Sequence, residues 1–167
     1  MAKQEKTNVM RTLERLKIPY RDYCYLDSGV ISGADVAKVL GQDPARVFKT
    51  LVTVGRSREM LVFMIPAAEE LDLKKAAAAA GEKAVEMLKA KDLLPLTGYV
   101  HGGCSPIGMK KQFRTFIHHT ASRYDTILFS AGKIGYQVEM PLAALRQAVP
   151  VQEADLTVTN GNGEAGE

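Results

Sequence analysis

The chain has 167 residues, 46% of them hydrophobic and 25% charged, which is the composition of one ordinary globular domain with a core of its own. No apolar run reaches the roughly 18 residues that cross a bilayer, and no hydrophobic segment follows the charged start, so we expect no membrane partner and no secretory signal. Two cysteines are too few for a disulfide framework, and the expected location is therefore the reducing cytoplasm.

The net charge of +3 hides an uneven distribution along the chain. Residues 1–150 hold all 22 Lys and Arg but only 15 of the 19 acidic residues, which gives this part a net charge of +7. A body this basic attracts polyanions such as nucleic acids, although an excess of merely solubilising lysines produces the same composition.

The first half of the chain is predicted to alternate short helices and strands. In order, it should form a helix over 7–17, a strand over 20–26, a helix over 33–40, strands over 47–54 and 60–65, a helix over 73–80 and a strand over 85–87. Thr7, Ser32 and Asp72 are the expected N-caps of the three helices. Gly41 and Gly81 are expected to end the second and the third helix.

The second half begins with a brief turn, capped by Asp92 and limited by Pro95, which leads into a glycine-rich loop. Strands are then predicted over 115–118, 126–130 and 136–140, and a closing helix starts at Pro141. From Thr157 the chain contains only Thr, Asn, Gly, Glu, Ala and one Val. We therefore expect one domain over 1–156 and a disordered tail over 157–167.

The strand over 47–54 contains a lysine in an apolar setting. Six of its eight residues are β-branched or aromatic, and both of its faces are mostly apolar, so it should be covered on both sides or curl into a barrel. Lys49 then needs a partner, a lowered pKa or a wet cavity. The alternative is an edge strand on which Lys49 only prevents aggregation.

The loop over 97–108 reads Thr-Gly-Tyr-Val-His-Gly-Gly-Cys-Ser-Pro-Ile-Gly. Its glycines allow the backbone to approach a ligand closely, and a long loop with so many special positions is more often functional than a plain connection. Lys110, Lys111 and Arg114 follow directly and are candidates for phosphate contacts, although a solvated basic face fits them equally well.

Several kinds of chemistry lack support in the sequence. No glycine motif for nucleotides is present, and His118 and His119 should point to opposite faces of a strand, so we expect no cofactor and no metal site. No nucleophile elbow surrounds Ser105, and a thiol–base pair of Cys104 and His101 lacks a third, orienting group. The residues alone indicate a basic, barrel-like body with a cavity for a carbonyl or phosphate ligand.

Four motifs, in this order along the chain, resemble the YbaK-type family of trans-editing aminoacyl-tRNA deacylases, to which the bacterial Cys-tRNA(Pro) deacylases belong. The motifs are Val-Phe-Lys-Thr-Leu at 47–51, Leu-Asp-Leu-Lys-Lys at 71–75, Gly-Gly-Cys-Ser-Pro-Ile-Gly-Met-Lys-Lys at 102–111 and Ser-Ala-Gly-Lys at 130–133. The resemblance extends over roughly residues 7–149. It implies a single α/β domain of the α+β type, with a mixed, barrel-like β-sheet surrounded by helices.

The resemblance also implies an activity in translation fidelity. Prolyl-tRNA synthetase mistakenly loads cysteine because a small side chain is hard to reject by binding alone. A family member removes the cysteine by cleaving the ester of Cys-tRNA(Pro). The substrate's own thiol attacks the ester carbonyl, and the cysteine is released as a cyclic thiolactone. The implied partners are the acceptor end of tRNA(Pro) and, in a transient complex, prolyl-tRNA synthetase.

The family's functional residues can be carried over position by position. Lys49 matches the essential lysine and is expected to orient the aminoacyl ester and stabilise charge on its oxygen. The expected substrate-binding residues are Tyr25, Thr50, Gly102, Gly103, Ser105, Ser130 and Gln137.

Gln137 departs from the family pattern, which has an aspartate in this last strand. Glutamine can hydrogen-bond an amine but cannot offset its charge, so the choice of amino acid can differ here. Two alternatives therefore remain: an editing deacylase for alanine or serine on tRNA, and a non-catalytic module that binds tRNA or a synthetase.

Overall fold

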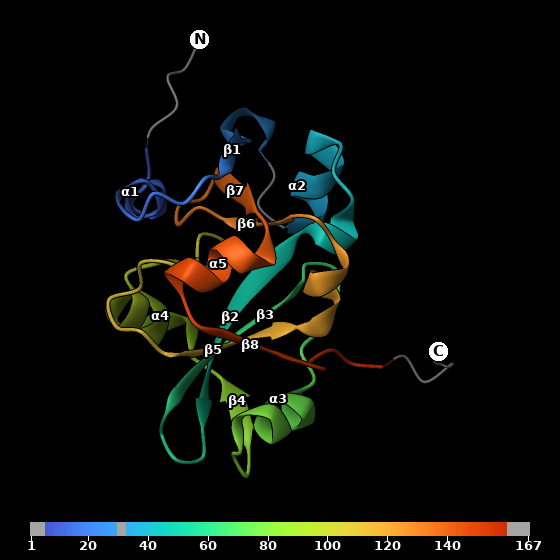
Figure 1. The fold of residues 1–167 in the computed structure, drawn as a ribbon. Coiled ribbons are helices and arrows are strands. Elements are labelled where there is room, and N and C mark those ends of the chain that lie inside the picture. Colours follow the sequence, from blue (N-terminus) through green and yellow to red (C-terminus); the bar gives the residue numbers. More distant parts are fainter. Residues whose placement is uncertain (1–5, 30–32, 160–167) are drawn as a thin grey trace.

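The computed structural model describes residues 6–29 and 33–159 and contains two β-sheets (Figure 1). The antiparallel sheet has the order β1–β7–β6, and the mixed sheet has the order β4–β2–β3–β5–β8. The strands are β1 (Arg21–Cys24), β2 (Phe48–Gly55), β3 (Met60–Pro66), β4 (Val85–Met87), β5 (Arg114–His118), β6 (Ile127–Ser130), β7 (Tyr136–Met140) and β8 (Val151–Ala154).

An isolated parallel bridge between Val47 and Leu128 connects the two sheets just before β2 begins. The expected single α/β domain with mixed strand directions is confirmed, but the sheets do not close into a barrel. β2 and β3 are antiparallel, whereas β3–β5 and β5–β8 are parallel.

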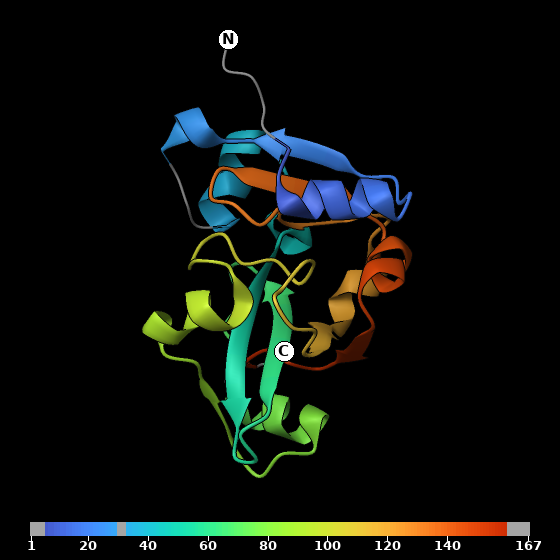
Figure 2. The ribbon, with the colours of Figure 1, turned by 90° about the vertical axis from the view of Figure 1, so that its left-hand side faces the viewer.

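The described residues form five α-helices around the sheets: α1 (Asn8–Arg15), α2 (Gly33–Leu40), α3 (Leu73–Ala80), α4 (Ala90–Thr97) and α5 (Leu142–Ala148). Figures 1 and 2 show α1 and α5 beside the three-stranded sheet and α3 at the far end of the molecule, next to β4. Thr7 and Asp72 are N-caps as predicted, and Gly81 ends α3 in the left-handed conformation. The predicted cap Ser32 lies outside the described residues.

The core has two main parts, and β3 separates them. Val62 and Met64 face the larger part, which includes α1, β6, β7 and α5, while Leu61, Phe63 and Ile65 face the smaller part beneath α3. Because β3 is covered on both faces, its sequence is a continuous apolar run rather than an alternation. None of the described helices is long and apolar enough to cross a membrane.

Two predictions about local structure are wrong, and one strand was missed. Pro95 lies inside α4 instead of limiting a turn, because Leu93 of α4 packs on the core and outweighs the backbone hydrogen bond that proline cannot donate. Strand β8 was not foreseen. The predicted tail begins too early: Thr157 is buried and pairs with Leu71, and the Val158 N–H donates to the Glu70 carbonyl.

Candidate functional site

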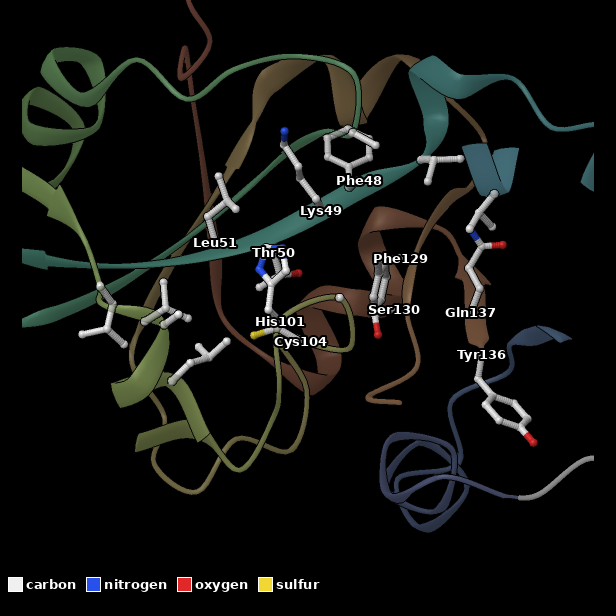
Figure 3. Close-up of a pocket in the computed structure, with 18 of the residues that line it drawn as sticks. Phe48, Lys49, Thr50, Leu51, His101, Cys104, Phe129, Ser130, Tyr136 and Gln137 are labelled. Atoms are coloured by element: carbon white, nitrogen blue, oxygen red, sulfur yellow. The ribbon is translucent and has the colours of Figure 1, made fainter. Parts of the chain in front are cut away.

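A cavity of about 640 Å³ lies beside the first half of β2 (Figure 3). Its walls come from β2 itself, from the segment that joins β4 to α4, from the loop around residues 101–104, and from the ends of β6 and β7. β2 pairs with β3 on one side along its length, but β4 covers its other side only over Thr53–Gly55. Residues 48–51 therefore present an open edge to the cavity.

Lys49 lines this cavity from the middle of the open edge. Figure 3 shows its side chain leaving β2 in the direction opposite to that of Thr50, as expected for neighbours on a strand. No hydrogen bond or ion pair joins its Nζ to any described residue. Burial lowers the pKa of the Lys49 ammonium, although nearby Glu70 and Glu69 act against the shift. The sequence-based alternative of an edge lysine in solvent does not fit a half-buried group on a cavity wall.

Thr50 also lines the cavity, on the other face of β2. Its Oγ1 is buried and has no hydrogen-bond partner among the described residues. A buried hydroxyl without a partner costs roughly 1–3 kcal/mol, which indicates a group that is held ready for a ligand.

The remaining expected residues on the cavity wall are Tyr25, Gly102, Ser130 and Gln137. Burial raises the pKa of the Tyr25 phenol, so the group remains neutral. Gly102 has a φ of +88°, a conformation that residues with a side chain rarely adopt. Ser130 and Gln137 are paired across β6 and β7, and the Ser130 Oγ accepts a hydrogen bond from the Gly132 N–H.

Gly103 and Ser105 lie behind the cavity wall rather than on it. A Cβ on Gly103 would stand 3.0 Å from the backbone nitrogen of Ile134, so glycine here permits the loop to pack against the turn between β6 and β7. Ser105 is fully buried, and its Oγ accepts from the Ile107 N–H. Both residues hold the loop in shape.

The three basic residues expected to contact phosphates do not line the cavity. The Lys110 Nζ donates to the Pro95 carbonyl, and Lys111 is exposed. Arg114 forms a two-pronged ion pair with Glu59 and also donates to the Ala80 carbonyl. This pairing lies near the β2–β3 turn, at the opposite end of β2, so Arg114 is a structural residue.

His101 and Cys104 line the cavity, although no binding role was predicted for them. Burial raises the pKa of the Cys104 thiol to about 12, so it stays protonated and a thiolate nucleophile is disfavoured. Nothing in the sequence pattern pointed to Met87, Leu88 and Leu93, which form an apolar part of the wall next to β2. Only the fold brings that wall to the cavity.

The prediction that His118 and His119 point apart is wrong, because β5 ends at His118 and a 3₁₀ helix begins at His119. The two ring centroids are 4.4 Å apart, and Asp155 lies near them. However, the His118 Nδ1 accepts from the Leu156 N–H, and its Nε2 is 3.5 Å from the Thr157 Oγ1. Both nitrogens of His118 thus have protein partners, so this cluster is better explained as structural than as a metal site.

Comparisons with known proteins fit this geometry. Residues 28–148 match the model of the aminoacyl-tRNA editing domain. A protein of Enterococcus faecalis named "Putative Cys-tRNA(Pro)/Cys-tRNA(Cys) deacylase EbsC" is 49% identical over 155 residues, which cover 92% of this chain and 94% of that protein.

Two crystal structures share the fold. One, described as "a putative trans-editing enzyme for prolyl tRNA synthetase", has a TM-score of 0.80 at 20% identity and covers 91% of this chain and 98% of that one. The other, of a hypothetical protein, has a TM-score of 0.82 at 19% identity, with coverage of 90% and 99%. The family match spans most of the chain and includes every cavity residue except Tyr25, and the chain therefore belongs to the aminoacyl-tRNA editing domain family.

Proposed function

We propose that this protein is a trans-editing deacylase that removes cysteine from mischarged tRNA(Pro). The observation that carries the proposal is a cavity in which a lysine and a threonine hydroxyl have no hydrogen-bond partner among the described residues, within a chain of the editing family. The name of the 49% identical relative supports the same substrate. A tRNA substrate also implies a cytoplasmic location, and prolyl-tRNA synthetase is the expected transient partner.

In this proposal Lys49 holds the aminoacyl ester and stabilises the negative charge that develops on its oxygen. The substrate sulfur attacks the carbonyl carbon of its own ester, the bond to the tRNA 3′ oxygen breaks, and that oxygen takes up the proton that the thiol loses. The products are tRNA with a free 3′ end and a cyclic thiolactone. The protonated state of Cys104 supports a mechanism in which no protein thiol takes part.

The other cavity residues receive binding roles. Because they line the cavity, Tyr25, Thr50, Ser130 and Gln137 are assigned to contact the aminoacyl group in this proposal, and Gly102 to offer its backbone to the ester or to the terminal adenosine. Gly103 and Ser105 support the loop that carries Gly102, so their effect on substrate is indirect.

The test is deacylation of Cys-tRNA(Pro), Ala-tRNA(Pro) and Ser-tRNA(Pro) by the wild type and by Lys49→Ala. Rapid loss of cysteine alone, abolished by the substitution, is the expected result. Faster loss of alanine or serine would establish the second candidate function, an editing deacylase for one of these amino acids. Neither amino acid has a thiol, so water would be the nucleophile. This candidate is retained because Gln137 is an amide where the family has an aspartate. No loss from any of the three would leave a tRNA-binding module and contradict the proposal.

A further inference from the structure

The cavity carries no negative charge on the described residues that line it. Neither Asp nor Glu is among them, and Lys49 brings a positive charge. Glu69 and Glu70 are near enough to influence Lys49, but they do not line the cavity. A substrate ammonium placed here would be repelled by Lys49 and would lose its hydration without meeting a carboxylate.

Gln137 is the amide that faces this cavity from β7. It is only 3% exposed, and Figure 3 shows its side chain pointing from β7 toward the start of β2. Its Oε1 accepts a hydrogen bond of 2.8 Å from the Nε2 of Gln42. No described residue accepts from the Gln137 Nε2. The group left for a ligand is therefore a hydrogen-bond donor.

Gln42 fixes this orientation from the end of α2. Gly41, with a φ of +67°, ends the helix, and the Gln42 N–H then donates to the Ala37 carbonyl, which holds the residue in place. As the pair stands, the Gln42 Oε1 is buried and has no partner among the described residues. If both amides were reversed, the two donors of the Gln42 Nε2 would be stranded instead. One orphaned acceptor costs less than two orphaned donors, so the observed orientation is favoured.

The orphaned oxygen also indicates what Gln42 is for. An apolar side chain of similar length would fill the same space without leaving a buried polar atom unpaired. Within residues 6–29 and 33–159 the Gln42 side chain makes one hydrogen bond, and that bond goes to Gln137. Its contribution is thus best explained by control of the Gln137 amide.

We propose that Gln42 is a positioning residue that directs the NH₂ group of Gln137 into the cavity, so that the site binds the substrate's α-amino group in its uncharged form. The inference rests on the proposed function. The amide donates to the lone pair of a neutral amine, whereas an ammonium has no lone pair and meets the Gln137 donors and Lys49 with like charge.

The test measures binding of a stable analogue, 3′-cysteinylamino-3′-deoxyadenosine, under reducing conditions at pH 6.0 and pH 8.5. An α-amino group titrates near pH 8, so its neutral fraction rises from a few per cent to a majority across this range, and we expect Kd to fall about tenfold or more. The N-acetyl derivative carries the same thiol but no titratable amine, and its Kd should change little.

The wall also carries other ionisable side chains, namely those of Tyr25, Lys49, His101, Cys104 and Tyr136. An imidazole can change its charge in the tested range, so the measurement is repeated with His101→Gln, in which the preference for high pH should persist. Loss of the trend in that variant would assign it to His101 and overturn the proposal.

Two variants of Gln42 test the positioning role. In Gln42→Glu the carboxylate can only accept, so it should draw the Gln137 NH₂ away and leave the Gln137 Oε1 facing the cavity; binding of the free amine should then favour pH 6.0. Gln42→Met keeps the length of the side chain but removes its hydrogen bond to Gln137, so the Kd of the free amine should depend less on pH. Retention of the wild-type trend in both variants would refute the role of Gln42.

The wild type separates this inference from the proposed function. Cysteine removal from Cys-tRNA(Pro), together with a Kd that is constant or lower at pH 6.0, would overturn only the neutral-amine inference. Failure of both analogues to bind, together with no deacylation, would overturn both.

Discussion

Lys49 and Lys75 are both half-buried, but their surroundings differ. The Lys75 Nζ donates to Asp155, to the Thr157 carbonyl and to the Thr159 Oγ1, so all three of its hydrogens are used. Lys49 has no such bond to any described residue, and burial lowers the pKa of its ammonium. A lysine with a complete set of partners holds the fold together, whereas one on a cavity wall without partners marks a place for a ligand.

The largest effect that follows from this difference is expected for Lys49→Met. Loss of an electrostatic group at a reacting oxygen typically lowers a rate by about 10²–10³-fold, and we expect a loss of this size in single-turnover deacylation of Cys-tRNA(Pro). The free energy of unfolding should not fall, because an ammonium without a partner is replaced by an apolar side chain.

Lys75→Met is the matched control. It should lower the free energy of unfolding in urea by about 1–3 kcal/mol, because the Thr157 carbonyl and neighbouring groups lose their donor. The folded variant should keep the wild-type rate. Equal rate losses in the two variants would contradict the assignment of Lys49 to the site and Lys75 to the scaffold.

The same contrast recurs on β7, where Gln137 and Glu139 project from one face, two residues apart. Glu139 accepts from Tyr23, Arg46 and Thr126 at 2.5 to 2.8 Å. Burial alone would raise the pKa of the Glu139 carboxyl, but these bonds outweigh it and lower the pKa below its ordinary 4.5. Gln137 has one partner and faces the cavity.

Glu139→Gln should therefore lower the free energy of unfolding at pH 7 by about 2 kcal/mol, because bonds to a charged acceptor are replaced by weaker ones. Since the folded-state pKa is lowered, the carboxylate contributes fully above about pH 4.5, and its contribution is lost as the pH falls through the folded value. The difference in unfolding free energy between the wild type and Glu139→Gln should become smaller between pH 5 and pH 3 in urea titrations. A gap that stays constant over that range would exclude this role.

A third test concerns the segment that Lys75 holds. Ending the chain after Leu156 removes the bonds of Thr157, Val158 and Thr159 and should cost about 1–2 kcal/mol of unfolding free energy relative to a chain that ends after Thr159. The Gly-, Asn- and Glu-rich composition of residues 160–167 predicts that a chain ending after Thr159 is as stable as the full chain. Equal stability of the two truncated chains would show that the segment contributes nothing.

Local sequence signals predicted the elements well, and long-range partners account for what they missed. The apolar strand around Lys49 and the cap at Asp72 follow from nearby residues alone. Arg114 was predicted to contact phosphate because the residues near it in the sequence give no sign of its ion-pair partner. That partner, Glu59, lies 55 residues away in the chain. Thr157 was placed in a tail because its composition is polar, although its bonds come from distant residues.

The cavity residues show a similar division. The family resemblance named Thr50, Ser130 and Gln137, and the structure brings all three to the same cavity. It also named Ser105, which turns away from the cavity to hold its own loop. The order of residues in a loop does not reveal which side chains point inward, because that depends on what the loop packs against. Gln42 carried no signal, since its importance lies in a contact with a residue 95 positions away.

The smallest expected effect separates two threonines on β2. The Thr50 Oγ1 has no partner in the described part of the chain, whereas the buried Thr53 Oγ1 donates to the Leu61 carbonyl at 3.0 Å. Thr50→Val removes an unsatisfied hydroxyl and should raise the free energy of unfolding by about 1 kcal/mol, while Thr53→Val should lower it by about the same amount.

Activity should show the opposite pattern. If the Thr50 hydroxyl meets its partner only in the substrate complex, Thr50→Val should lower kcat/KM for Cys-tRNA(Pro) by about tenfold, equivalent to one hydrogen bond, and Thr53→Val should leave it unchanged. A Thr50→Val protein that is more stable and fully active would show that the hydroxyl is not used by the substrate. Reduced stability in that variant would instead mean that Thr50 has a partner in the folded protein, and the contrast between the two faces of β2 would fail.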